Sequence, residues 1–464
     1  MSVVRSPRPA IRAPAAVPAE RDPDPGRPRR GRPPARTEIL RAGRLGGLDA
    51  EILAARFGTP FYAYDLDVVD RQVGALRAVL PPAFDLAYAV KANPSLGIVA
   101  HLAGLGLGAD VASLGELATA LRAGIAPGTI VMTGPGKRDD ELAAAVAAGI
   151  RAVTVESRGE LRRLARIAQD AGRRVPVLLR AAVPAARRLE RVRLVGDDGA
   201  GKFGMDEADL PGVAAEAAAS PDLELLGLHA FGASNVTDAA ALAGHVAATL
   251  ALARRIAHAT GIPLRLVDAG GGLGIPYEAG DAGLDLPGLG RLLRELVDGW
   301  RTDPLTRDAR ILLEPGRFLV GPAGAYVARV VDRKTVDGRA VAILDGGIHH
   351  LLRPVLTGQD HRVRRLGGPP DGAGRVVPVT IAGPLCSGLD VFATEAMLVP
   401  PEPGELVAVL DAGAYGFTES MPFFLSHPVP AEVALRNGQA ALLRPRLEPG
   451  SWLDWQRIPA WEGR

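Results

Sequence analysis

Side chains able to take part in chemistry recur along this sequence, each at the end of a short apolar run. The first is Lys91, which closes the run Tyr88-Ala-Val-Lys91 and precedes Ala-Asn-Pro. Only four of the 54 basic residues are lysines, and an amine at the end of a buried strand is costly unless it is paired or used covalently. We therefore expect a site centred on this lysine. The other runs end at Asp110, Arg180, His229, Asp268 and Glu314.

Three consecutive glycines follow closely after Asp268. Gly270, Gly271 and Gly272 leave backbone N–H groups bare, so an anion can approach them closely. The stretch does not fit a dinucleotide-binding fingerprint, because it lacks the further spaced glycine and comes late in the chain. A strand-end lysine, a phosphate cradle and an acid on the neighbouring strand together indicate a Schiff-base lysine that holds pyridoxal phosphate.

The elements that must position these residues alternate regularly. From Tyr62 to Gly316, short β-branched runs are separated by helical stretches such as Gly159–Ala171. Parallel strands need a helical crossover each time, and eight near-regular units favour a closed (β/α)8 barrel over a doubly wound open sheet. The active site of such a barrel lies at the carboxyl ends of its strands, where the residues above fall. The predicted strands are Phe84–Val90, Gly108–Ala112, Thr129–Thr133, Ala152–Glu156, Val175–Arg180, Leu225–Ala230, Leu264–Asp268 and Arg310–Leu313.

The regions outside the barrel differ in composition. Residues 1–36 hold nine prolines and nine arginines against three acids, which predicts a disordered Pro/Arg-rich tail. After Gly316, Gly/Pro turns between short strands predict a mostly β C-terminal domain. We thus divide the chain into the tail 1–36, an N-terminal segment 37–64 that joins the β domain, a cofactor-binding barrel 65–316 and a β domain 317–464. The strands predicted for the β domain are Tyr326–Val331, Val341–Asp345, Val376–Ile381, Leu406–Leu410, Ala431–Val433 and Gln439–Leu443.

The overall composition excludes several classes of protein. The 464 residues carry a formal net charge of only +2, which argues against nucleic-acid binding by bulk electrostatics. The lone cysteine, Cys386, excludes an internal disulfide framework. No apolar run reaches the length of about 18 residues that a membrane-spanning helix needs. We expect a cytoplasmic protein that binds neither nucleic acid nor membrane.

An ordered set of motifs resembles the ornithine/diaminopimelate decarboxylase family. These are fold-type III pyridoxal-phosphate enzymes, built from a barrel followed by a β domain. The stretch Phe424-Leu-Ser-His427-Pro further resembles a branch from biosynthetic clusters, in which some decarboxylases act on substrates tethered to a carrier protein. The family motifs present are Tyr88-Ala-Val-Lys91-Ala-Asn-Pro94, Asp110-Val-Ala-Ser113, Gly270-Gly-Gly272, Glu314-Pro-Gly-Arg317, Gly383-Pro-Leu-Cys386-Ser-Gly-Leu-Asp390 and Asp411-Ala-Gly-Ala-Tyr415-Gly.

This resemblance implies roles around the cofactor. Lys91 would attach it covalently, and Glu314 would face the pyridine nitrogen, where alanine racemases of the same fold class use an arginine. Family members stack a histidine on the ring. That position here is Phe231, with His229 two residues earlier, and the sequence leaves open which of them stacks. The implied cofactor-binding residues are Lys91, Asp110, Arg180, His229, Phe231, Ser234, Gly271, Gly272, Glu314, Gly316, Arg317 and Tyr415.

Cys386 falls on the position of the family's catalytic cysteine. The resemblance implies that its thiol returns a proton to the α-carbon after decarboxylation. In the family this segment enters the neighbouring subunit's site, which implies a homodimer with shared active sites.

Substrate recognition departs from the family pattern. Ser387 stands where diaminopimelate enzymes have a glutamate and ornithine enzymes an aspartate, so a distal ammonium loses one counter-charge. Asp345 and Arg353 fall on positions that contact the distal amine or carboxylate, and Asp390 completes the candidate substrate-binding set. A distal group that is uncharged, carboxylate-bearing or tethered fits at least as well as a lysine precursor.

The predicted function is therefore pyridoxal-phosphate-dependent removal of the α-carboxylate from an amino acid or a derivative, the derivatives including one tethered to a carrier protein. The alternatives are diaminopimelate decarboxylation in lysine biosynthesis, racemisation on the same scaffold, and a cofactor-binding regulatory relative without catalysis. His349, His350 and His361 show no metal-ligand spacing, so we expect exposed loop histidines and no metal site.

Overall fold

The computed structural model describes residues 39–459, except for 42, 184–188, 191–200, 279 and 367–373; for 189, 190 and 233 it describes the backbone alone. The predicted tail 1–36 lies outside the described residues. No described helix combines the length and the apolar composition needed to cross a membrane.

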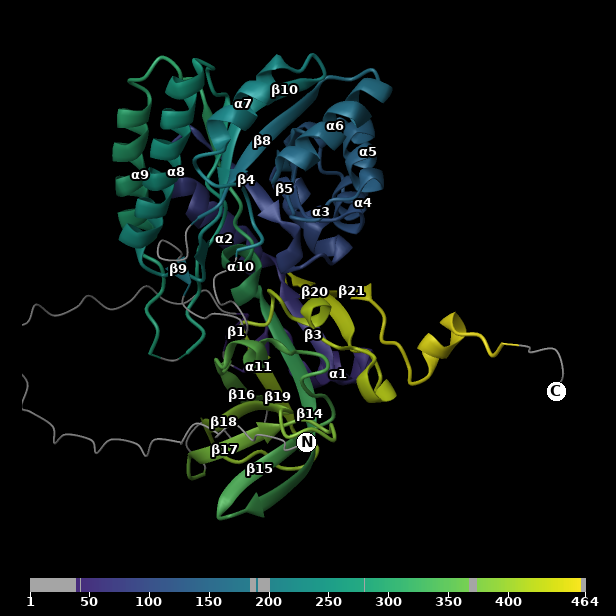
Figure 1. Ribbon diagram of the computed structural model, residues 1–464. Coiled ribbons are helices and arrows are strands. Elements are labelled where there is room, and N and C mark those ends of the chain that lie inside the picture. Colours follow the sequence, from purple (N-terminus) through teal and green to yellow (C-terminus); the bar gives the residue numbers. More distant parts are fainter. Residues whose placement is uncertain are drawn as a thin grey trace, which may run out of the picture. The chain divides into compact units, whose positions relative to one another are not determined.

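Eight parallel strands close into a barrel (Figure 1). All eight predicted strands are present, which confirms the closed barrel against the open sheet. Neighbouring strands follow chain order throughout, as right-handed helical crossovers require. The barrel strands are β4 (Phe84–Ala89), β5 (Gly108–Val111), β6 (Ile130–Met132), β7 (Ala152–Val155), β8 (Val175–Ala181), β10 (Leu223–Ala230), β12 (Leu266–Asp268) and β13 (Arg310–Leu313).

A helix follows each barrel strand. Side-chain caps fix where several of these helices begin: Ser113, Ser157 and Asp238 accept hydrogen bonds from the first-turn amides. Such caps hold the loops at the carboxyl ends of the strands, where the predicted site lies. The helices are α2 (Leu66–Val79), which precedes β4, and α3 (Leu96–Gly104), α4 (Leu114–Arg122), α5 (Asp139–Ala148), α6 (Arg158–Asp170), α7 (Leu210–Ala219), α8 (Ala239–Thr260), α9 (Leu286–Trp300) and α10 (Arg317–Val320).

The C-terminal region is mostly β, as predicted. It contains two strands that the sequence did not indicate, β16 (Val363–Leu366) and β18 (Val391–Leu398). Asp337 and Gly338 both have positive φ and turn the chain between the antiparallel neighbours β14 and β15. The remaining strands are β14 (Gly324–Val336), β15 (Arg339–Leu344), β17 (Val377–Ala382), β19 (Leu406–Leu410), β20 (Ala431–Arg436) and β21 (Gln439–Arg444).

One strand from the start of the described chain joins this sheet. β3 (Phe61–Asp65) pairs antiparallel with β14 and parallel with β20. Its residues are buried on both faces, and Tyr62 packs its ring 5.2 Å from that of Tyr326, measured between centroids. The minor elements are β1 (Leu40–Arg41), β2 (Arg44–Leu45), α1 (Ala50–Phe57), β9 (Leu189–Glu190), β11 (Ala233–Ser234) and α11 (Arg353–Thr357).

Candidate active site

Lys91 lies in a short 3-10 turn, Val90–Ala92, directly after β4. Its Nζ is 2.7 Å from Oδ2 of Asp110, a buried carboxylate on β5 whose Oδ1 accepts a 2.6 Å bond from the Thr133 hydroxyl. Burial lowers the pKa of the amine, but the charge of Asp110 outweighs that effect and raises the pKa above its ordinary value. With 39% of its side chain accessible, Lys91 still faces open space.

The glycines beside Lys91 leave no room for side chains. A Cβ on Gly271 would lie 2.4 Å from the carbonyl oxygen of Glu314, and one on Gly316 would lie 2.8 Å from Cβ of Ala92. Gly272 has a φ of +99°, which L-residues rarely adopt. Their backbone therefore borders the same cavity as Lys91, together with Phe231, Ser234, Glu314, Arg317 and Tyr415.

A segment of the β region completes this cavity. The backbone N–H of Tyr415 donates a 2.8 Å bond to the carbonyl of Ala92, next to Lys91, and Asn93 Nδ2 donates a 3.0 Å bond to the carbonyl of Gly413. The guanidinium of Arg317 lies 4.6 Å from the centroid of the Tyr415 ring. It also donates a 2.7 Å bond to the hydroxyl of Tyr277. Arg317 is thereby oriented at the glycine side of the cavity.

Glu314, Asp268 and His229 form a buried group behind the cavity. Their ligand-type atoms all lie within 4.8 Å of one another, and Nε2 of His229 is 3.9 Å from Oε2 of Glu314. Burial raises the pKa of Asp268 to about 7 and that of Glu314 well above its usual range, whereas burial lowers the pKa of His229. At neutral pH we infer one shared proton on the two carboxyls and a neutral imidazole.

The structure separates the two candidates for the ring-stacking position. Phe231 lines the cavity, and its ring centroid is 5.9 Å from Nζ of Lys91. His229 is 1% exposed, and neither of its ring nitrogens has a hydrogen-bond partner among the described residues. Phe231 therefore presents the aromatic face to the cavity, while His229 lies behind Glu314.

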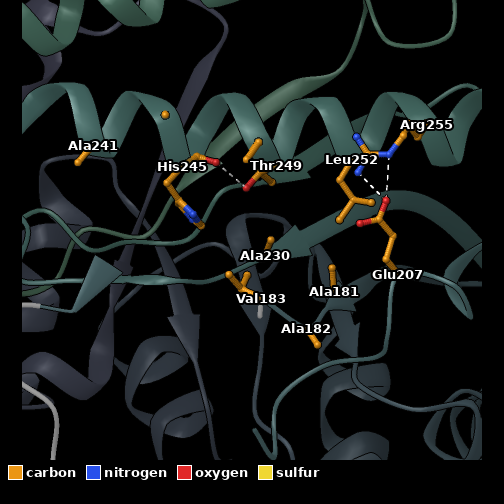
Figure 2. Close-up of a pocket in the computed structure, with 12 residues that line it drawn as sticks. Ala181, Ala182, Val183, Glu207, Ala230, Ala241, His245, Thr249, Leu252 and Arg255 are labelled. Atoms are coloured by element: carbon orange, nitrogen blue, oxygen red, sulfur yellow. Dashed lines mark hydrogen bonds and ion pairs between the residues drawn. The ribbon is translucent and has the colours of Figure 1, made fainter. Parts of the chain in front are cut away.

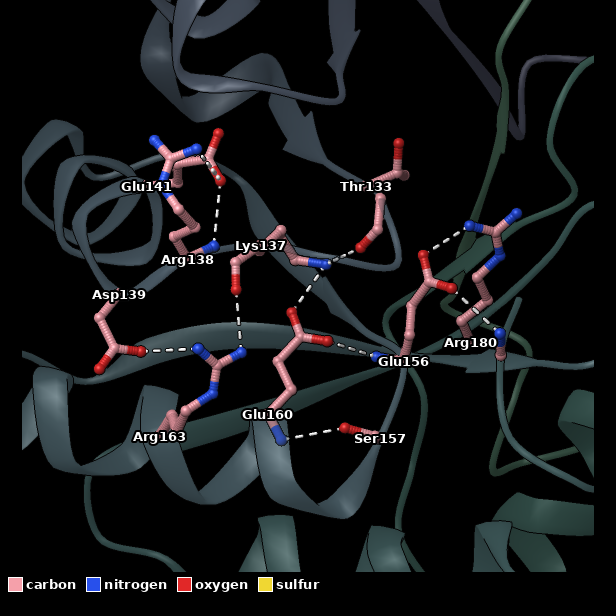
Figure 3. Close-up of polar contacts among 12 residues, drawn as sticks. Thr133, Lys137, Arg138, Asp139, Glu141, Glu156, Ser157, Glu160, Arg163 and Arg180 are labelled. Carbon is pink, nitrogen blue, oxygen red and sulfur yellow. Dashed lines mark hydrogen bonds and ion pairs between the residues drawn. The ribbon is translucent and has the colours of Figure 1, made fainter. Parts of the chain in front are cut away.

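Arg180 belongs to a buried ion-pair network on the adjacent strand ends (Figure 3). Its Nη1 is 2.6 Å from Oε1 of Glu156, whose Oε2 accepts a 3.0 Å bond from the Gly204 amide. Lys137 pairs with Glu160 at 2.7 Å, and Glu160 accepts a bond from the Glu156 amide. The network fixes Arg180 by side-chain and backbone contacts together.

The predicted Cys386 segment lies outside the Lys91 cavity of its own chain. Cys386 is exposed, and the neighbouring Leu389 is 64% exposed. The carboxylate of Asp390, predicted to bind substrate, is instead engaged by two backbone amides, Ile348 at 2.8 Å and Leu385 at 2.7 Å. Here Asp390 shapes the loop that carries Cys386 and Ser387.

The other predicted substrate residues differ in their surroundings. Arg353 lines a cavity that shares Ser234, Asn235 and Arg317 with the Lys91 cavity. Asp345 accepts a 2.9 Å bond from the amide of Arg329, and burial raises its pKa. Among the described residues, Asp345 lines neither the Lys91 cavity nor the Arg353 cavity.

The expectation of exposed loop histidines is wrong. His349 and His350 are fully buried with their ring centroids 3.6 Å apart, and His361 is 4% exposed. Burial lowers the pKa of His349 to about 3 and that of His361 to about 4. Nearby aromatic residues fill the space around these rings, which loop composition alone does not reveal.

A separate cavity lies between α8 and the ends of β8 and β10 (Figure 2). Alanine is the commonest residue type in its lining. Thr249 donates a 3.0 Å bond to the carbonyl of His245, and Arg255 pairs with Glu207 at 2.6 Å. It shares no lining residue with the Lys91 cavity.

The residues of the Lys91 cavity fit pyridoxal phosphate. The glycine backbone and Arg317 offer donors to a dianion, Lys91 offers an amine, and the buried Oε1 of Glu314 has no partner among the described residues.

Four residues of the site and its support were not among the site residues predicted from the sequence: Asp268, Tyr277, Thr133 and Glu156. Asp268 could have been included, because it ends a predicted barrel strand and such ends form the rim of the site.

The matched families agree with this geometry. Residues 66–321 match the pyridoxal binding domain of pyridoxal-dependent decarboxylases. The chain is 32% identical over 401 residues to an L-glutamyl-[BtrI acyl-carrier protein] decarboxylase from Niallia circulans, covering 84% of this chain and 92% of that one. It is 34% identical over 419 residues to a diaminopimelate decarboxylase from Methanothermobacter thermautotrophicus, covering 90% and 96%.

A solved structure with the same fold is diaminopimelate decarboxylase from Helicobacter pylori complexed with L-lysine. It has a TM-score of 0.79 at 29% identity and covers 88% of this chain and 99% of that chain.

Proposed function

The chain belongs to the pyridoxal-dependent decarboxylase family, and from this premise we propose that it removes the α-carboxylate of an amino acid whose distal end is linked to a carrier protein. The observation that carries the proposal is the juxtaposition of Lys91, paired with Asp110, and the glycine backbone in one cavity. The relative from Niallia circulans, which acts on a glutamyl carrier protein, supports the substrate class.

The residues of the cavity have separate roles in the proposed reaction. Pyridoxal phosphate, when bound, accepts the electron pair left at the α-carbon as carbon dioxide departs. Lys91 supplies the amine for its attachment, and Asp110 orients that amine. Glu314, whose pKa is raised by burial, holds a proton at its carboxyl for the ring nitrogen.

The phosphate contacts come from both parts of the chain. The amides of Gly271, Gly272 and Gly316 bind the dianion together with Arg317, Ser234 and the hydroxyl of Tyr415. Phe231 supplies an apolar face for the ring. Arg180, held by Glu156, supports this arrangement from the adjacent strand ends.

We infer further that two copies of the chain complete each other's sites. Cys386 is exposed and does not line the Lys91 cavity of its own chain, although the loop that carries it is well ordered by Asp390. In a homodimer with shared sites, the Cys386 thiol of one subunit returns a proton to the α-carbon held by the other.

Diaminopimelate decarboxylation is the second candidate. The presence of Arg353 in the cavity next to Lys91 favours it, because a guanidinium can bind a distal carboxylate. Racemisation is less well supported, since Glu314 rather than an arginine borders the cavity.

A substrate panel tests the reaction. Cofactor-loaded protein is incubated with free amino acids, meso-diaminopimelate and glutamyl carrier protein, and carbon dioxide is measured. We expect release from the carrier-linked substrate and its loss in Lys91→Ala, but not in the exposed control Lys334→Ala. Borohydride reduction and peptide mapping should place the cofactor on Lys91. Exchange of the α-hydrogen without gas release would falsify decarboxylation.

A further inference from the structure

Arg353 is already neutralised within its own chain. Its Nη1 lies 3.0 Å from Oε1 and 3.2 Å from Oε2 of Glu419. The two side chains are largely buried, with 13% of Arg353 and 26% of Glu419 exposed. A pair with this little exposure is weakly screened by solvent, so Glu419 cancels most of the charge that Arg353 offers.

The pair is held in place by its surroundings. Glu419 ends the short turn Phe417–Glu419, and the hydroxyl of the next residue, Ser420, donates a 2.7 Å bond to the carbonyl of Gly416. The same hydroxyl accepts a 3.0 Å bond from the amide of Leu352, the residue just before Arg353. One serine therefore ties the segment of Glu419 to the start of α11.

The pair stands next to the cofactor cavity. The centroid of the Tyr415 ring lies 4.6 Å from the guanidinium carbon of Arg317 and 4.9 Å from that of Arg353. The Arg353 cavity shares three lining residues with the Lys91 cavity. A substrate attached near Lys91 can therefore extend its distal end toward Arg353.

The charges that border the two cavities are all compensated. Among the described lining residues the strong cations are Lys91, Arg317 and Arg353. Lys91 pairs with Asp110, Arg353 pairs with Glu419, and the proposed function assigns Arg317 to the phosphate. In the loop that carries Cys386, Ser387 has no carboxylate to pair with a distal ammonium. Among the described residues that line the two cavities, neither sign of distal charge therefore finds an available partner.

We propose that Glu419 is a specificity-determining residue, which pairs with Arg353 and thereby selects substrates whose distal carbonyl is uncharged, as in a thioester or an amide. The inference rests on the proposed function, α-decarboxylation, and narrows its substrate class. A free distal carboxylate must either displace Glu419 from Arg353 or lie beside it as a like charge, and both are unfavourable.

Matched substrate pairs test this assignment. Each pair shares one α-amino acid and differs at the distal end: the free carboxylate against its primary amide and its N-acetylcysteamine thioester. In the wild-type enzyme we expect kcat/KM for the neutral members to exceed that for the carboxylates by about tenfold or more. A wild-type preference for the carboxylates overturns the inference without any variant.

Glu419→Gln then tests the residue itself. We expect it to raise kcat/KM for the carboxylates by about tenfold, mostly through KM, and to shift the carboxylate-to-amide ratio accordingly. The gain should vanish in the double variant Glu419→Gln/Arg353→Gln, because no free guanidinium is left. Glu402→Gln removes the exposed carboxylate that pairs with Arg333 and should leave the ratio unchanged.

The outcomes are distinct. An unchanged ratio in Glu419→Gln, with turnover of the amide retained, contradicts the role of Glu419 and leaves α-decarboxylation standing. Absence of carbon dioxide from every substrate with the wild-type enzyme contradicts the proposed function, and the inference with it. A gain that survives in the double variant also overturns the inference, because it shows that Arg353 is not the group released.

Discussion

Asp268 and Glu314 stand at the ends of neighbouring barrel strands, with a carboxylate oxygen of each within 4.8 Å of the other and with both side chains buried. Two buried carboxyls so close together cannot both ionise without a large cost, so they share a proton at neutral pH. The pair stores this proton where the ring nitrogen of the cofactor is expected.

The Asp268–Glu314 pair predicts a pH dependence of stability. Its raised pKa values mean that the folded state favours the protonated form, so its contribution is present at low pH and is lost as pH rises through about 7. Near pH 6.5 the unfolded state still protonates the histidines that the folded state keeps neutral, which acts in the opposite direction, but this contribution is common to the wild type and Asp268→Asn. We therefore expect the melting temperature of the cofactor-free wild type to fall between pH 6.5 and pH 8 by about 2 °C or more relative to that of Asp268→Asn.

Asp268→Asn should flatten that decline, as measured by thermal denaturation at pH 6.5 and pH 8. Asp308→Asn alters an exposed carboxylate and should leave it unchanged. Parallel profiles for the wild type and Asp268→Asn would show that the pair does not hold the proton.

His349 predicts the opposite behaviour at acid pH. Its ring is fully buried, and burial holds its pKa at about 3, so the folded state keeps it neutral while the unfolded state takes up a proton below about pH 6.5. His349→Phe keeps an aromatic ring beside His350 and removes this penalty. At pH 5 we expect a gain in the free energy of unfolding of about 2 kcal/mol relative to the change at pH 7.5.

Urea denaturation at the two pH values measures this difference. His258→Phe serves as the control, because that exposed imidazole pairs with Asp303 and its removal should bring no gain at pH 5. An equal loss of stability on acidification in the wild type and His349→Phe would contradict the prediction.

The barrel and most of its site could be predicted because their signals are local. Lys91, Asp110 and Glu314 each end a run of apolar residues, and parallel strands bring such ends to one rim. The burial of His349 and His350 could not be predicted, because it depends on rings from Tyr62, Tyr326 and His427 that are distant in sequence.

The buried Glu156–Arg180 pair is expected to support both stability and cofactor binding. Glu156→Gln leaves the buried guanidinium of Arg180 without the negative charge that now lies 2.6 Å away, and we expect the free energy of unfolding to fall by about 3 kcal/mol. Cofactor affinity, titrated by absorbance, should fall with it. In contrast, Glu216→Gln breaks surface pairs with Arg158 and Arg162 and should cost less than about 1 kcal/mol. Similar costs for the two variants would show that the buried pair has no special role.

If two subunits share their active sites, a Cys386 variant and a Lys91 variant should restore each other's activity in mixed dimers. Cys386→Ala should keep the cofactor but lower kcat by about 10²-fold or more, since a proton donor is lost. Mixing it with inactive Lys91→Ala under conditions of subunit exchange should restore about a quarter of wild-type activity, because each mixed dimer then has one intact site. No recovery despite verified exchange would place Cys386 in the site of its own chain.

The weaker predictions concern the β region, where side-chain patterns are less regular. β16 carries two arginines in four residues, and β18 mixes Ala, Thr and Glu, so neither shows a clean alternation. Asp390 has the residue type of a substrate ligand, yet its two backbone amide partners arise only from the fold of the loop. The Arg353–Glu419 pair likewise joins positions 66 residues apart.

β3 lies near the start of the described chain, yet one of its two neighbours, β20, comes from near its end. During synthesis, Phe61–Asp65 stays half-paired until Ala431–Arg436 has left the ribosome, and Tyr415 emerges only shortly before. The vitamin B6 aldehyde therefore meets a complete cavity only after Tyr415 has been synthesised, more than 300 residues after Lys91.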